Sequence, residues 1–387
     1  MKLTKKYYIL VSLISVVLLS GCTTQRQAQI SDTDGLVFTN SGVDVSNLRE
    51  SDKYFTVYFD VENQGSTTSH EAVLHLFGSS WIVPYPVILS SPTSPAFKAP
   101  DITTNPPTPG DFKTIEFTLP TPDVPEGIKS TYNLVGRLEY QYASNAVAQL
   151  KIYSRDEYRR RQDKGGVIDT AVELTNTNGP IKISVSGPEP MLVDKIFPGD
   201  PPYDEYTLKF IFKNTGSGVP ILHAGELQSF RTIDGVILGR IRLDQDGVGF
   251  SNCFGRPSLP DFEYQGGLRW GVTPKEIILN PGLFNDFPDV KLRKGDEVTK
   301  QCTVRILRDV WGNRPEGTLT LTFELIYDYY TEQQVVVDIT GEPGDRSGMA
   351  DYEQEARQEF QFSPTLRNAF FYINPAARAE SETEPQW

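Results

Sequence analysis

Apolar and polar residues alternate along several stretches of the chain, and two of these stretches match each other. Residues 55–66 read Phe-Thr-Val-Tyr-Phe-Asp-Val-Glu-Asn-Gln-Gly-Ser, and residues 206–217 read Tyr-Thr-Leu-Lys-Phe-Ile-Phe-Lys-Asn-Thr-Gly-Ser. Alternation with a period of two is typical of a strand with one buried face, and Asn-x-Gly favours the turn that ends it. The pattern therefore predicts two equivalent strands, each followed by a turn.

A second matching pair lies further along the chain. Leu138-Glu-Tyr-Gln-Tyr142 matches Leu325-Ile-Tyr-Asp-Tyr329, and each is followed by polar residues and another strand-like segment, at 148–153 and 335–339. This arrangement predicts a hairpin that closes each unit. The two matches are offset by 151 and 187 residues, so the second unit carries about 36 extra residues between its matching segments.

The remaining pattern predicts an all-β protein with a duplicated architecture. The chain has 387 residues, and its 31 glycines and 28 prolines, spread along its length, exclude long helices. We expect two tandem β-sandwiches at 35–155 and 180–342, joined by a charged linker at 156–179. Further predicted strands are 72–77, 113–119, 132–142, 236–243, 298–307 and 318–329. The tail, 343–387, is expected to be partly helical and partly disordered.

The strand that ends in Asn-x-Gly and the closing Tyr-x-Tyr segment resemble immunoglobulin-like domains of archaeal and bacterial surface proteins. The resemblance covers about three quarters of the chain. It implies two tandem immunoglobulin-like sandwiches with a short helical C-terminal extension. Modules of this kind belong to cell adhesion and related surface roles, so the resemblance implies a structural or binding function.

The N-terminus has the form of an export signal. Residues 1–6 carry three lysines, residues 7–19 contain no charge, and Leu19-Ser-Gly-Cys22 follows. This tetrapeptide resembles the lipobox of prokaryotic lipoproteins, which implies a signal peptide at 1–21, a lipid on Cys22 and a tether at 22–34. The protein is then anchored in the membrane and faces the cell exterior or the periplasm. An ordinary secretory signal or an uncleaved N-terminal anchor remains the alternative.

The charge balance limits the classes of partner. The chain has 37 Lys and Arg against 50 Asp and Glu, a net charge of −13, which argues against nucleic acid. The one dense basic cluster of the expected mature chain, Arg159 to Arg161, lies in the charged segment 154–166, which is either a short helix or an exposed linker. A solvated face is the favoured interpretation, with an anionic lipid or polysaccharide as the alternative. The expected partners are the membrane, through the lipid, and an envelope protein or polymer.

Two further cysteines, Cys253 and Cys302, both fall in the second predicted unit. In an oxidising compartment two cysteines of one domain usually form a disulfide, and we expect one here. A free reactive thiol is the alternative, but neither cysteine has a nearby histidine in the sequence to act as a base.

No catalytic or metal-binding motif stands out, so we expect neither an enzyme nor a bound cofactor or metal. The three histidines, His70, His75 and His223, do not form a ligand pattern, and the Asp-Gly pairs favour turns over calcium loops. The alternative is a surface hydrolase acting on an envelope polymer, with carboxylates in a groove lined by tryptophans. Candidates for that lining are Trp81, Trp270 and Trp311.

The tail contains an apolar run at 369–373 that follows a helix-like stretch at 349–360. An apolar run in a tail either docks on its own domain or binds another protein. The candidate partner-binding residues are Phe370, Phe371, Tyr372 and Ile373. We expect an envelope lipoprotein with a structural or binding role. A further alternative is a subunit of an extracellular filament or secretion assembly, in which this run completes the sheet of a neighbour.

Overall fold

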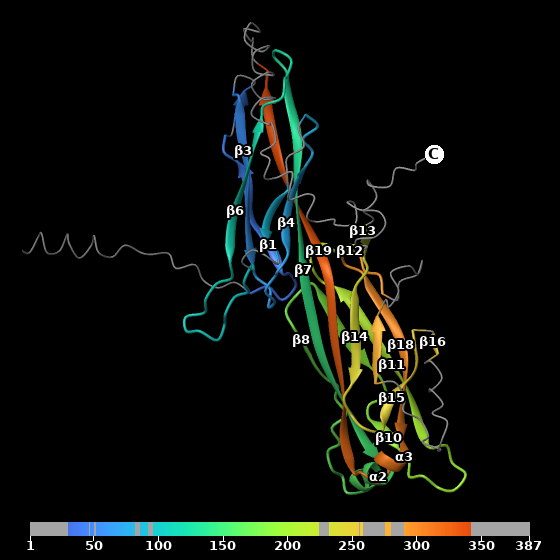
Figure 1. Cartoon of the computed structure of the whole chain (residues 1–387). Coiled ribbons are helices and arrows are strands. Elements are labelled where there is room, and N and C mark those ends of the chain that lie inside the picture. Colours follow the sequence, from blue (N-terminus) through green and yellow to red (C-terminus); the bar gives the residue numbers. More distant parts are fainter. Residues whose placement is uncertain are drawn as a thin grey trace, which may run out of the picture.

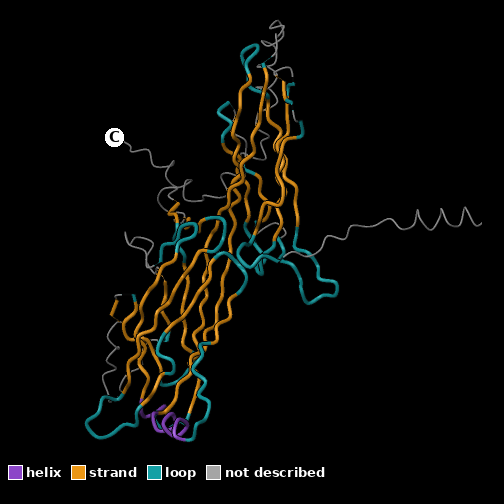
Figure 2. The backbone as a smooth tube through the Cα atoms, turned by 180° about the vertical axis from the view of Figure 1, so that it is seen from behind, coloured by secondary structure: helices purple, strands orange, loops and turns teal. Residues whose placement is uncertain are grey.

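The computed structural model describes residues 30–45, 47–49, 52–81, 86–91, 96–223, 232–254, 256–257, 275–279 and 290–341. Within these ranges strands are the main secondary structure, and the two helices, α2 (Arg155–Asp163) and α3 (Arg308–Trp311), are short. The all-β class is therefore confirmed. The molecule is elongated, and both helices lie at one end of it (Figures 1 and 2).

Two lobes follow each other along the long axis (Figure 1). The first lobe is built on β1 (Leu36–Val43), β2 (Leu48–Arg49), β3 (Tyr54–Asn63), β4 (Ala72–Phe77), β5 (Val87–Ser90) and β6 (Phe112–Pro120). The second lobe is built on β8 (Glu173–Asn176), β9 (Ile181–Ser186), β10 (Met191–Val193), β11 (Tyr203–Asn214), β12 (Val219–His223), β13 (Thr232–Asp234), β14 (Leu238–Leu243), β15 (Val248–Cys253), β16 (Arg256–Pro257), β17 (Glu276–Leu279) and β18 (Glu297–Leu307).

Two long strands run through both lobes. β7 (Lys129–Ser154) and β19 (Glu316–Thr340) pair antiparallel without a break in register, from the Glu316–Tyr153 pair to the Thr340–Lys129 pair. The expected closing hairpins are therefore wrong, because each predicted hairpin is one half of a continuous strand. The segment expected as a linker, 156–179, holds most of α2 and also β8, which pairs with β7.

The β7–β19 pair is the centre of a large sheet that is covered on one face. Even-numbered residues of β7 are buried from Leu134 to Ile152, and odd-numbered residues of β19 are buried from Leu319 to Ile339 except Gln333. This alternation does not change phase between the lobes, so the same face of the ribbon is buried in both. The sheet β1-β3-β6 covers it in the first lobe, and the sheet β16-β15-β18-β11-β9 covers it in the second.

The duplication relates the two lobes by an approximate two-fold axis through the ribbon. Gln141 and Asp328 occupy equivalent positions 187 residues apart, and they also pair directly across the two strands. The other pairings repeat in the same way: β3 pairs with β1 and β6, and β11 pairs with β9 and β18. β2 runs parallel to the end of β19, as β10 does to the end of β7. Each lobe thus contains half of each long strand.

Four tyrosines pack where the lobes meet. Tyr140 and Tyr142 on β7 lie opposite Tyr329 and Tyr327 on β19, with ring centroids 5.8 to 6.2 Å apart around the group. The Tyr142 hydroxyl accepts a hydrogen bond from the Ser66 amide at 3.1 Å, in the first Asn-x-Gly-Ser turn. Tyr329 accepts from the Gly218 amide at 2.9 Å, just past the second such turn. The two repeated turns are therefore fixed to the ribbon by the repeated Tyr-x-Tyr segment.

The described chain begins at this junction and holds the lobes together there. Asp34 accepts hydrogen bonds from the Ser217 amide and hydroxyl, both at 3.0 Å, and so links the start of the first lobe to the turn of the second. The converse contact is the Ser66 hydroxyl, which donates to the Asn178 carbonyl at 2.7 Å. The lobes are thus joined both by the continuous ribbon and by these reciprocal contacts.

Cys253 and Cys302 form a disulfide between adjacent strands of the second lobe. They are directly paired across β15 and β18, 49 residues apart in sequence, and both are buried. The expected bridge is therefore present. It fixes part of the extra sequence of the second lobe, because β15 belongs to that additional segment and has no counterpart among the described strands of the first lobe.

Candidate functional site

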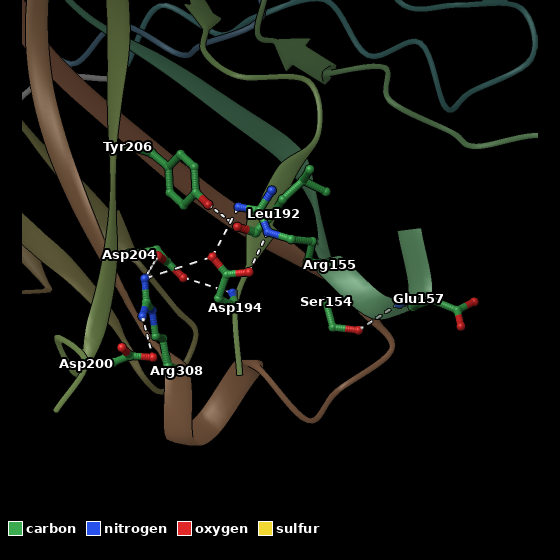
Figure 3. A network of polar contacts seen from close by, with 9 residues as sticks. All are labelled: Ser154, Arg155, Glu157, Leu192, Asp194, Asp200, Asp204, Tyr206 and Arg308. Carbon is green, nitrogen blue, oxygen red and sulfur yellow. Dashed lines mark hydrogen bonds and ion pairs between the residues drawn. The ribbon is translucent and has the colours of Figure 1, made fainter. Parts of the chain in front are cut away.

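The far end of the second lobe concentrates charged side chains from four parts of the chain (Figure 3). Arg155 opens α2 directly after β7, and Arg308 opens α3 directly after β18. Asp194 follows β10, and Asp204 lies near the start of β11. Because all four elements end or begin here, residues far apart in sequence are brought together. We call this network the polar clamp.

The helix α2 is positioned by its own sequence. Ser154 is its N-cap, and the Ser154 hydroxyl accepts from the Glu157 amide at 3.3 Å. Ser-x-x-Glu is a sequence signature of a helix start. Of the two alternatives for residues 154–166, a short helix or an exposed linker, the helix is therefore present. The Glu157 carboxylate is bound by Arg160 at 2.6 Å and by Arg161 at 2.7 Å. Hydrogen bonds from these two arginines lower the pKa of Glu157 to about 2.

The dense basic cluster is therefore largely neutralised within the protein. Arg161 also bonds Glu316 at 2.7 Å and lies over the Tyr153 ring, which fastens α2 to the ends of β7 and β19. Arg159 and Arg160 are exposed to solvent. The structure thus gives two of the three arginines a bracing role.

Arg308 is the centre of the polar clamp. Its side chain is only 13% exposed, and it contacts three carboxylates: Asp204 by a short hydrogen bond, Asp200 at 3.7 Å and Asp194 at 4.0 Å. The hydrogen bond to Asp204 raises the pKa of Arg308, so the guanidinium stays charged. Removal of a nearly buried cation of this kind leaves its carboxylates uncompensated, which is strongly destabilising.

A second arginine completes the polar clamp. Arg155 binds Asp194 in a forked arrangement, with Nη2 donating to Oδ2 at 3.1 Å. The Asp194 amide donates to the Asp204 carboxylate at 3.0 Å, and the Tyr206 hydroxyl donates to the Leu192 carbonyl. Burial raises the pKa of Tyr206 to about 12. The network joins β7, β10, β11 and β18 at one end of the lobe.

The polar clamp holds both ends of a tight turn that exposes apolar side chains. The Asp200 amide donates to the Phe197 carbonyl at 3.0 Å, and the Phe197 amide donates to the Asp200 carboxylate at 3.3 Å. Gly199 has a φ of +95°, which a turn of this type requires and which favours glycine. Ile196 is 44% exposed and Phe197 is 63% exposed at its tip. The sequence Ile-Phe-Pro-Gly-Asp signals this turn, but it was not among the predicted site residues.

The predicted site residues other than the disulfide lie outside the described part of the chain. These are the lipidation candidate Cys22 and the tail residues Phe370, Phe371, Tyr372 and Ile373. Trp270, a candidate for the groove of a hydrolase, also lies outside it. Trp311 is 4% exposed, and its indole donates to the Asp246 carbonyl. Trp81 packs against Tyr132 and donates to the Pro120 carbonyl, so both described tryptophans serve the fold.

No group of three or more His, Cys, Asp or Glu side chains in the described ranges is arranged to hold a metal ion. His75 lies on the uncovered face of β4, 3.9 Å from Glu139, and His70 precedes the strand. None of the described helices has the length and hydropathy needed to cross a bilayer. No protein-family model matches the chain, and no curated protein matches it significantly.

Proposed function

We propose that the protein is a membrane-anchored envelope lipoprotein that acts as a rigid structural or binding element. The observation that carries the proposal is the continuous β7–β19 ribbon, which makes one stiff body of the two lobes. A long body without a hinge is suited to holding a partner at a fixed distance and orientation. Each lobe, with two sheets packed around alternating inward residues, is proposed to be an immunoglobulin-like sandwich.

The position of the N-terminal segment supports this geometry. The described chain begins at Ile30 and is tied to the junction through Ser31, whose amide donates to the Gln64 carbonyl at 2.8 Å. A lipid on Cys22 would therefore tether the middle of the body and not one of its ends. Eight residues, 22–29, span at most ~28 Å when fully extended. Both ends of the body then lie away from the attachment point of the tether and can reach other components of the envelope.

Cys22→Ser tests the anchoring part of the proposal. In a host with a lipoprotein pathway, the unchanged protein is expected in the membrane fraction, with a lipid-sized mass increase on its N-terminal peptide. The variant is expected to lose both the lipid and the membrane association. Equal membrane retention of the variant, or an unmodified Cys22 in the membrane fraction, would contradict the proposal.

The partner-holding part is tested by the shape of the protein in solution. Small-angle scattering of the mature chain is expected to give one long maximum dimension that does not change with salt, because the ribbon fixes the lobes. A distribution of shorter, bent shapes would show a hinge and remove the physical basis for a rigid spacer.

A further inference from the structure

We propose that the turn at 196–199 is a second membrane contact, which inserts Ile196 and Phe197 into the same bilayer as the lipid anchor. Its membrane setting rests on the proposed function. The turn itself stands on the described geometry: two exposed apolar side chains on a tight, braced turn at the tip of the second lobe. The class of ligand is a lipid bilayer, with headgroups around the turn and acyl chains at its tip.

The shape of the turn favours a bilayer over a shaped pocket. Ile196 and Phe197 are adjacent and exposed at the outer end of the lobe, and Pro198 continues the apolar sequence. A bilayer interface accepts such a projection without a complementary cavity. Burial of two apolar side chains gives a weak membrane contact alone and a useful one in a protein that also carries a lipid anchor.

The polar clamp reduces the negative charge that would oppose this contact. Asp194 and Asp200 flank the tip, and an acidic protein with two free carboxylates there would be repelled by an anionic surface. Both carboxylates face Arg308, and Asp194 also binds Arg155. The two guanidiniums thus offset most of the charge of the three carboxylates of the polar clamp, while the apolar side chains of the turn stay exposed.

Cations lie on the same end of the lobe. Lys195, next to the tip, bonds Asp156 of α2 at 2.7 Å with half of its side chain exposed. Arg159 and Arg160 follow on α2 and are exposed. Lys195 and Arg160 are already paired with Asp156 and Glu157, so the exposed Arg159 is the cation of this group that adds attraction to anionic headgroups.

The duplication provides an internal comparison. The equivalent connection in the first lobe, between β2 and β3, has the same reciprocal bonds: the Arg49 amide donates to the Asp52 carboxylate at 2.8 Å, and the Asp52 amide donates to the Arg49 carbonyl at 2.9 Å. The two residues between them in the sequence, Glu50 and Ser51, are polar. By these bonds Arg49 takes the position of Phe197, so the turn of the first lobe begins with an exposed basic residue where the turn of the second lobe begins with an exposed aromatic one.

The tether permits the contact. From Gln141 at the junction to Ser154 at the end of β7, the ribbon extends ~43 Å at 3.3 Å per residue. A body tilted toward the bilayer brings the far end of the second lobe to the surface while the junction stays within the ~28 Å reach of residues 22–29.

Phe197→Trp, on a mature chain with Cys22→Ser and an N-terminal histidine tag, tests the contact. The protein is held on phosphatidylcholine vesicles by a nickel-chelating lipid, with and without phosphatidylglycerol, so lipidation of Cys22 plays no part. Some of the acyl chains of these vesicles are brominated.

The added tryptophan is expected to show a blue-shifted emission and more quenching by bromine than the parent chain shows. The quenching is expected to be stronger on vesicles that contain phosphatidylglycerol. Ile128→Trp, at an exposed apolar position (51%) at the end of the first lobe, is the matched control and is expected to remain unquenched.

Hydrogen exchange supplies a measurement without a substitution at the tip. Amides of residues 195–200 are expected to exchange more slowly on vesicles than in solution, and the variant Ile196→Ser/Phe197→Ser is expected to lose this protection. An unquenched tryptophan in the Phe197→Trp variant, together with unchanged exchange, would overturn the proposal. Protection that needs added envelope protein and occurs without bromine quenching would also overturn it, and would identify a protein pocket as the ligand. A failure of lipidation at Cys22 changes neither result.

Discussion

Ser144 on β7 and Tyr327 on β19 share a buried hydrogen bond 2.6 Å long, whereas their equivalents in the duplicated chain, Thr331 and Tyr140, are buried without one. The equivalents lie 187 residues away in each case. The Thr331 and Tyr140 hydroxyls have no hydrogen-bond partner among the described residues. Burial raises the pKa of both Tyr140 and Tyr327 well above the ordinary value, so both hydroxyls stay protonated. Among the described residues, the Tyr327 hydroxyl is therefore hydrogen-bonded at the junction, and its equivalent on Tyr140 is not.

This difference predicts opposite effects for two identical substitutions. Tyr327→Phe leaves the buried Ser144 hydroxyl without this partner and is expected to cost ~1 to 3 kcal/mol of unfolding free energy. Tyr140→Phe removes a hydroxyl that has no partner among the described residues, so it is expected to be neutral or slightly stabilising. Urea denaturation of both variants measures the contrast. Equal losses would show that the Ser144–Tyr327 bond contributes nothing beyond the tyrosine rings.

The repeated turns are packed too closely for a side chain. A Cβ on Gly216 would lie 2.4 Å from the Tyr329 hydroxyl and 2.6 Å from Pro180 Cβ. Gly216→Ala is therefore expected to displace the turn from the β7–β19 ribbon and to lower the free energy of unfolding by ~1 to 3 kcal/mol. Gly166→Ala is the control, because the nearest atom to its Cβ is the Arg161 carbonyl oxygen at 3.5 Å. Thermal melts should show a lower midpoint for Gly216→Ala than for Gly166→Ala. A small decrease of the same size in both variants would mean that the turn can move to make room for the added methyl group.

Most of the strand positions could be predicted from alternation, because each strand buries one face. The predicted strand at 72–77 matches β4, and those at 113–119 and 298–307 match β6 and β18 within one residue at each end. The continuity of β7 was missed because Ala143-Ser-Asn145 has turn-like composition. The Ser144 side chain nevertheless points inward, and its hydroxyl can be buried because it shares a hydrogen bond with the Tyr327 hydroxyl on the other strand. A partner 183 residues away is not visible in local sequence, although the unbroken alternation itself was a usable signal.

The candidate site was harder to predict for the same reason. Arg155, Asp194, Asp204 and Arg308 lie in four separate segments, and nothing in their spacing shows that they meet. Their meeting depends on β7 continuing into the second lobe, since Arg155 follows its last residue. A chain divided into two closed hairpin units would have separated Arg155 from Arg308. The disulfide needed only two cysteines in one unit and an oxidising compartment, and that prediction is confirmed.

The disulfide is expected to make the second lobe sensitive to reduction. It links residues 49 apart, and in the chain-entropy treatment a loop of this size contributes ~4 kcal/mol. Dithiothreitol should therefore lower the thermal midpoint of the mature chain. The variant Cys253→Ala/Cys302→Ala should melt at the lower temperature with or without the reductant. If the unchanged protein melts alike in both conditions and reacts with a thiol reagent before reduction, the cysteines are free in solution.

The attachment of α2 predicts a specific pH dependence. Hydrogen bonds from Arg160 and Arg161 lower the pKa of Glu157 to about 2, below its value in an unfolded chain, ~4.3. A lowered carboxylate pKa contributes stability that is fully present above the unfolded pKa and is lost as the pH falls through the folded value. Glu157→Gln is therefore expected to be less stable than the unchanged protein at about pH 5 to 7, with a difference that shrinks from about pH 4 toward pH 2. Asp309→Asn, at an exposed acidic residue of α3, is the matched control for the loss of a helix carboxylate. Melts across this range check the prediction, and a constant difference down to about pH 2 would mean that Glu157 acts by packing and not by its charge.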